Sequence, residues 1–95
     1  MIYPLYKGLP LVPSRSVANE LHNCNLMLRD ILEVLEQGYD CAKSKRKKGI
    51  IERCLDRKRK TTKVVVARAY NYSLDSEAWV IIHVGIITKS KRVRK

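Results

Sequence analysis

The second half of the chain contains the residue types that a metal-independent ribonuclease uses. Such an enzyme needs a base for the 2′-hydroxyl proton, an acid for the leaving oxygen and cations that stabilise the charge on the phosphorane. His83 could serve as the acid or the base, and Arg68 and Arg53 could hold the phosphate, with Tyr70 beside them. A shared site requires a fold that brings these four side chains together.

Two expected strands would have to present these residues on one surface. Side chains alternate along a strand, so one face of the last strand would carry Trp79, Ile81, His83 and Gly85. One face of the strand before it would carry Val64, Val66, Arg68 and Tyr70. If the two faces coincide, the candidates form a cluster. The alternatives are a hydrogen-bonded histidine in an apolar strand and arginines on a solvated strand face.

The charge of the chain is large and unevenly distributed. The 95 residues include 20 Lys and Arg against 9 Asp and Glu, a net charge of +11. Residues 1–42 carry −2 and the remaining residues carry +13. The excess lies in two expected turns and a tail, at Lys45, Arg46, Lys47, Lys48, Arg57, Lys58, Arg59, Lys60, Lys89, Lys91 and Arg92.

A basic surplus of this size exceeds what a small domain needs for solubility. Lysine and arginine clusters contact phosphates without reading sequence, which predicts binding to a polyanion such as RNA. An acidic protein could satisfy the same charges. The sequence therefore predicts an anionic partner and leaves its class open.

The cysteines predict neither a metal site nor a disulfide framework. Cys24, Cys41 and Cys54 are odd in number and widely spaced, without the Cys-x-x-Cys pairs of most structural zinc sites. A site that combines them with His22 is the alternative. We expect free, mostly buried thiols, a reducing compartment and no cofactor.

No segment is suited to a membrane or to export. The longest apolar run, from Ala78 to Thr88, is interrupted by His83 and is shorter than the roughly 20 residues that span a bilayer. The first 13 residues contain Lys7 and three prolines, unlike a signal peptide. We expect a soluble, cytoplasmic protein with no membrane partner.

Apolar periodicity predicts helices first and strands afterwards. Leu28, Ile31, Leu32 and Leu35 form a helical stripe, which indicates a helix near 26–37 with Asn25 as N-cap and Gly38 as its stop. A shorter helix is expected at 16–23. Four β-rich segments follow, at 39–44, 50–56, 62–70 and 79–88, separated by turns at 45–49, 58–61 and 73–77.

This order predicts an α+β fold in which two N-terminal helices pack on a four-stranded antiparallel sheet. The single domain would span residues 14–90, after an extended segment at 1–13 and before a basic tail at 91–95.

The string from Leu28 to Gly38, followed by Val64-Val65-Val66 and an isoleucine-rich last strand, resembles a known family. It is similar to domain of unknown function 4258 and to the allied BrnT-like toxins of the RelE-type ribonuclease superfamily, over residues 14–90. The resemblance implies a RelE-like fold, metal-independent cleavage of RNA and silencing by an acidic antitoxin protein.

The chain departs from that family in its first helix. The histidine and arginines usual there fall near Ser16, Glu20 and Cys24, and none is preserved. This difference favours binding over catalysis. The leading hypothesis is an RNA-binding domain of toxin-type descent, with endoribonuclease activity left open. The alternative is a non-catalytic interaction module that docks a protein partner, or self-associates as a homodimer, through an exposed sheet face or edge strand.

Overall fold

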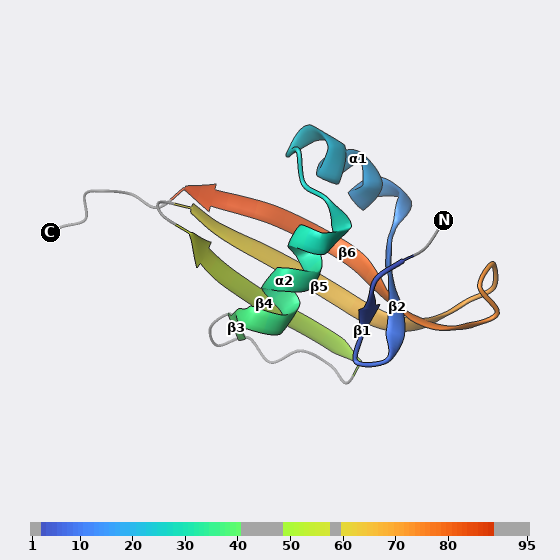
Figure 1. Cartoon of the computed structure of the whole chain (residues 1–95). Coiled ribbons are helices and arrows are strands. Elements are labelled where there is room, and N and C mark those ends of the chain that lie inside the picture. Colours follow the sequence, from blue (N-terminus) through green and yellow to red (C-terminus); the bar gives the residue numbers. More distant parts are fainter. Residues whose placement is uncertain (1–2, 41–48, 58–59, 89–95) are drawn as a thin grey trace, which may run out of the picture.

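The computed structural model describes residues 3–40, 49–57 and 60–88. Within these ranges the chain forms two helices and six strands, and Figure 1 shows their arrangement. In chain order they are β1 (Leu5–Tyr6), β2 (Leu9–Pro13), α1 (Arg15–Asn23), α2 (Leu28–Gln37), β3 (Tyr39–Asp40), β4 (Ile50–Arg57), β5 (Lys60–Asn71) and β6 (Ser76–Thr88).

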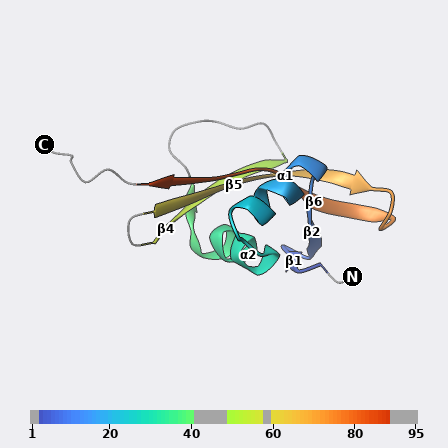
Figure 2. The same cartoon turned by 90° about the horizontal axis from the view of Figure 1, so that it is seen from above.

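All six strands belong to one mixed sheet in the order β1-β2-β6-β5-β4-β3. Strand β2 runs parallel to β6, and every other neighbouring pair is antiparallel. The sheet curves into a half-barrel, and Figure 2 shows both helices on the same side of it. The expected four-stranded antiparallel sheet under two N-terminal helices is therefore wrong.

The difference arises in the segment before the helices. Lys7 and Gly8 have positive φ angles of 51° and 81°, which allow a tight two-residue turn between β1 and β2. Strand β2 then pairs with β6 from Leu11, opposite Trp79, to Pro13, opposite Ile81. The extended N-terminal segment thus supplies two strands of the sheet.

Prolines made this strand hard to recognise, since proline cannot donate to a ladder. The N–H of Leu11 donates to the carbonyl of Pro4 at 2.8 Å, and the N–H of Ser14 donates to Ile81 at 3.0 Å. Pro10 lies one residue before the ladder with β6 begins, so its missing N–H removes no bond of that ladder.

Helix α1 begins where the sequence predicts a helix, and α2 begins slightly later than expected. The Ser14 hydroxyl caps α1 by accepting a hydrogen bond from the Val17 N–H at 3.3 Å. Met27, and not Asn25, is the N-cap of α2, and its N–H donates to the Asp30 carboxylate at 2.8 Å. Gly38 ends α2 as expected, because a Cβ there would collide with backbone oxygens.

The last three strands lie close to their predicted positions. The segment expected at 39–44 is β3 over Tyr39–Asp40, and its remainder lies outside the described residues. The turn at 45–49 and part of the turn at 58–61 also lie outside them. The third turn occupies residues 72–75.

The core lies between the helices and the sheet. The largest side chains with less than 2% exposure come from β2, α2, β5 and β6, and they are Leu11, Ile31, Leu35, Val64, Val66 and Ile81. Complete burial of such a side chain stabilises the fold by about 1.5–3 kcal/mol. Strand β2 is therefore part of the core that holds the helices on the sheet.

A bulge in β6 changes which face its later residues occupy. Val66 lies opposite Ile81, but Val65 lies opposite His83, so Ile82 is an extra residue in the ladder. After Ile82, the side chains of β6 that would have pointed to one face of the sheet point to the other. His83 therefore shares the face of Val65, which points away from the helices.

The packing of β2 predicts a large effect of shortening Leu11, whose exposure is 0%. Leu11→Ala should lower the free energy of unfolding by about 2–5 kcal/mol, measured by urea denaturation. Leu5→Ala is the matched control, since Leu5 is 60% exposed on β1. Equal stability of the two variants would contradict the docking of the N-terminal hairpin.

Candidate nucleic-acid interface

The four residues expected to form a catalytic cluster lie on two faces of the sheet. Arg68 lies opposite Trp79 in the ladder, and Tyr70 lies opposite Glu77, on the face that carries the helices. His83 is on the other face because of the bulge at Ile82. The cluster was expected from unbroken alternation along β6, and the fold does not bring these side chains to one surface.

Arg53 completes the C-terminal end of α2. Its guanidinium donates to the carbonyl of Gly38 and to the carboxylate of Asp40, the latter at 3.0 Å. A cation at this position satisfies a free helix carbonyl and interacts favourably with the helix dipole. Its positive charge also partly offsets the rise in the pKa of Tyr6 that burial causes. Arg53 is thus engaged within the fold.

Arg68 and Tyr70 are likewise bonded to neighbouring side chains, but at the exposed end of the β5–β6 hairpin. The Nε of Arg68 donates to Glu77 at 2.7 Å. The hydroxyl of Tyr70 donates to Asp75, and this hydrogen bond raises the pKa of Tyr70. An exposed ion pair of this kind contributes little to stability, so Arg68 can exchange its partner at small cost.

Two exposed tyrosines form the aromatic surface at the end of this hairpin. The rings of Tyr70 and Tyr72 meet edge to face, with centroids 4.9 Å apart, and Tyr72 is 88% exposed. Trp79, on the strand that follows this turn, is buried against Tyr6, with a distance of 5.8 Å between the ring centroids. Only the tyrosines could therefore stack on a base.

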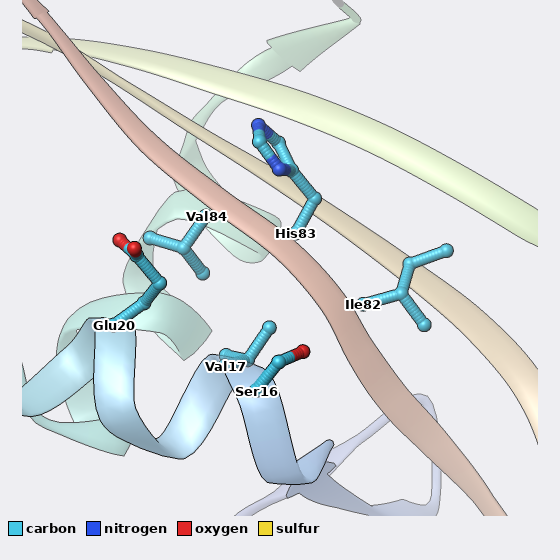
Figure 3. A pocket seen from close by; sticks show the side chains of 6 residues that line it. All are labelled: Ser16, Val17, Glu20, Ile82, His83 and Val84. Atoms are coloured by element: carbon cyan, nitrogen blue, oxygen red, sulfur yellow. The ribbon is translucent and has the colours of Figure 1, made fainter.

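A pocket of about 260 Å³ lies between α1 and β6, lined by Ser16, Val17, Glu20, Ile82, His83 and Val84. Ser16 and Glu20 are two of the residues near which the resemblance would place a histidine and an arginine. Figure 3 shows the His83 ring pointing away from them, across β6. The polar residues of the pocket come from α1 and β6, but they do not form a pair of nucleophile and base.

The described part of the chain is nearly neutral. It contains all nine acidic residues and eight of the twenty basic ones, a formal charge of −1. Several of these cations are ion-paired, as in Arg57 with Glu33 and Lys63 with Glu52 at 2.7 Å. The other twelve basic residues lie in 41–48, 58–59 and 89–95, which contain no acidic residue. The whole basic surplus therefore belongs to these three segments.

Two of the three segments leave the sheet at the same end. Arg57 lies opposite Lys60 in the β4–β5 ladder, and Lys60 lies opposite Thr88 in the β5–β6 ladder. Residues 58–59 connect the first pair, and residues 89–95 follow Thr88. This basic end, defined by Arg57, Lys60 and Thr88, is the attachment point for seven further cations.

The predicted phosphate-binding residues divide between described and undescribed parts of the chain. Arg57 and Lys60 are exposed at the basic end. The others lie outside the described residues, and they are Lys45, Arg46, Lys47, Lys48, Lys58, Arg59, Lys89, Lys91 and Arg92. The sequence gives the charges of these residues, and the fold gives the positions of the described residues to which their segments are joined.

The cysteines differ from expectation at one position. Cys24 is free, whereas Cys54 is disulfide-bonded. Disulfides persist mainly in oxidising compartments, so this bond runs against the reducing compartment that the cysteine count predicted. Among residues 3–40, 49–57 and 60–88, no three His, Cys, Asp or Glu side chains are grouped to bind a metal.

No helix in the described ranges is long and apolar enough to cross a membrane. Comparisons with protein-family models, with curated proteins and with solved structures find no match to this chain. The resemblance to domain of unknown function 4258 and the BrnT-like toxins stays a prediction.

The position of Arg53 predicts a structural effect of its removal. Arg53→Ala should lower the free energy of unfolding by about 1–3 kcal/mol, because it leaves the Gly38 carbonyl without this donor. The control Arg68→Ala breaks an exposed ion pair and should cost less than about 1 kcal/mol. Urea denaturation measures both, and an unchanged stability of Arg53→Ala would contradict the capping role.

Proposed function

We propose that the protein binds RNA through basic segments carried on a nearly neutral folded body. Phosphate contacts would be made by the residues at and beyond the basic end, together with residues 45–48. The single observation that supports this most strongly is the division of charge: −1 in the described residues, and twelve cations with no acidic residue in the three segments outside them. The proposal includes a cytoplasmic location, where RNA is accessible; the Cys54 disulfide is the one observation that runs against it.

This distribution suits a polyanion better than a compact anionic ligand. A chain of phosphates can contact many cations at once and release a counterion at each contact, which produces strong, salt-dependent binding. Such contacts position the nucleic acid without selecting its sequence. The exposed pair of Tyr70 and Tyr72 adds a surface on which an unpaired base could stack.

The arrangement supports binding more than cleavage. Arg53 is engaged at the end of α2, and His83 is separated from Arg68 and Tyr70 by the sheet. A general acid or base acts through hydrogen-bonding distance, and a phosphate clamp must reach the same phosphate. We therefore expect RNA binding without metal-independent cleavage.

The binding proposal predicts a large effect of the tail. A variant with Lys89, Lys91, Arg92, Arg94 and Lys95 replaced by Gln should bind single-stranded RNA more weakly. The slope of log K against log salt concentration should become shallower by about 3–4, because five phosphate contacts are removed. Fluorescence anisotropy at several salt concentrations measures both quantities.

The control variant replaces Lys7, Arg15 and Arg29 by Gln, which removes cations from the folded body. It should keep the native salt slope. Polyglutamate of matched charge is the second control, and it should bind more weakly than RNA. Salt-independent RNA binding, or polyglutamate binding as tight as that of RNA, would overturn the proposal, and the latter would favour an acidic protein partner.

Catalysis is tested separately by incubating the protein with RNA in EDTA. We expect no cleavage above that of a protein-free sample. The two histidines provide a matched pair, because His22 and His83 are both exposed, on α1 and β6 respectively. Cleavage that His83→Ala abolishes and His22→Ala preserves would instead establish a metal-independent ribonuclease.

A further inference from the structure

The turn between β5 and β6 is fixed by its own hydrogen bonds and projects beyond the helices (Figure 1). The side-chain oxygen of Asn71 accepts a hydrogen bond from the Leu74 N–H at 2.9 Å. The Tyr70 hydroxyl donates to Asp75, which has a positive φ of 53°, a conformation that aspartate adopts more readily than most residues. These bonds hold the side chains at the end of the hairpin in one arrangement.

The Tyr72 ring at this end is held on one side and open on the other. It meets the Tyr70 ring edge to face, with centroids 4.9 Å apart, and the residue is still 88% exposed. An aromatic ring supported in this way is a surface on which a flat ligand can stack.

A cation lies beside the two rings. Arg68 precedes Tyr70 by two residues on the same face of β5, a separation of about 7 Å between Cα atoms. Its Nε donates to Glu77, but within the described part of the chain its two terminal amino groups form no hydrogen bond. The side chain is 55% exposed. A guanidinium with two such groups can hold a phosphate, at about the distance that separates the phosphate from the base of one nucleotide.

We propose that this hairpin end, defined by Arg68, Tyr70 and Tyr72, binds one unpaired nucleotide of the RNA. The base stacks on Tyr72, and the terminal amino groups of Arg68 donate to the phosphate. The site rests on the proposed function and adds a preference for single strands, because the faces of paired bases are covered by their neighbours in a duplex. The substrate class is therefore RNA with unpaired nucleotides.

The charge of the hairpin end favours a base over a row of phosphates. Asp75 and Glu77 lie beside Arg68, so two negative charges accompany one positive charge. Stacking on an aromatic ring needs no positive surface, whereas further phosphates would be repelled. The length of β5, Lys60–Asn71, separates this end from the basic end by about 36 Å. A strand bound at both would have its phosphates neutralised at one end and a base stacked at the other.

Fluorescence anisotropy with three matched ligands tests the site. They are a single-stranded RNA of about 16 nucleotides, an abasic strand of the same length and the corresponding duplex. The native protein should bind the base-carrying single strand most tightly. Tyr72→Leu should weaken that binding about five-fold or more and abolish the preference over the abasic strand, since the stacking ring is lost. Its salt slope should stay native, because no cation is removed.

Arg68→Gln should have the opposite effect. The slope of log K against log salt concentration should become shallower by about 0.7, because one phosphate contact of a single strand is lost. The preference for bases over the abasic strand should remain.

Tyr39 and Tyr70 provide a matched pair of controls. They are 49% and 46% exposed, and each hydroxyl donates to an aspartate, Asp56 and Asp75 respectively. Tyr70→Leu should weaken binding to the single strand, because it removes the support of the Tyr72 ring. Tyr39→Leu, on β3, should bind like the native chain. Circular dichroism verifies that each variant is folded.

Three results would overturn the hairpin site alone, with the salt dependence of RNA binding intact. They are native binding by Tyr72→Leu, an equal loss in Tyr39→Leu, and equal affinity of the native protein for the abasic strand. The last would indicate a protein partner for the tyrosines. Salt-independent RNA binding would overturn the proposed function, and this site with it.

Discussion

The parallel pairing of β2 with β6 is the constraint on which the rest of the structure depends. It places Leu11 in the core and brings the start of α1 against the sheet. It also ends at Ile81, which leaves the remainder of β6 open and creates the pocket between α1 and β6. The length of this ladder thus determines both how the helices are held and which backbone groups remain free.

Acidic and basic residues are distributed differently over the chain. The acidic residues all lie in the described body, where several neutralise neighbouring cations, as Asp40 does for Arg53 and Glu77 for Arg68. The other twelve cations lie in three short segments that contain no acidic residue. In our account the body serves as a neutral support, and the segments supply the attraction for RNA.

Periodicity predicted the parts of the fold that regular elements define. Ile31 and Leu35 were identified from a helical stripe and are buried, and the positions of β5 and β6 follow from their β-branched residues. The N-terminal strands were missed because prolines conceal β2, and because a parallel partner distant in the sequence leaves no local signal. The predicted cluster was wrong because one extra residue in β6, Ile82, moves His83 to the face opposite that of Arg68 and Tyr70. A single bulge reverses the face on which every later side chain of the strand lies, and nothing in the local sequence indicates this bulge.

We proposed the RNA-binding surface from the charge distribution, and a residue-specific titration tests its position most directly. Amide chemical shifts of the ¹⁵N-labelled protein can be followed while single-stranded RNA is added at low salt. The account predicts that, among the described residues, the largest changes occur at Arg57, Lys60 and Thr88, with little change at Arg53. Changes centred on His83 and Ser16, with none at the basic end, would contradict it.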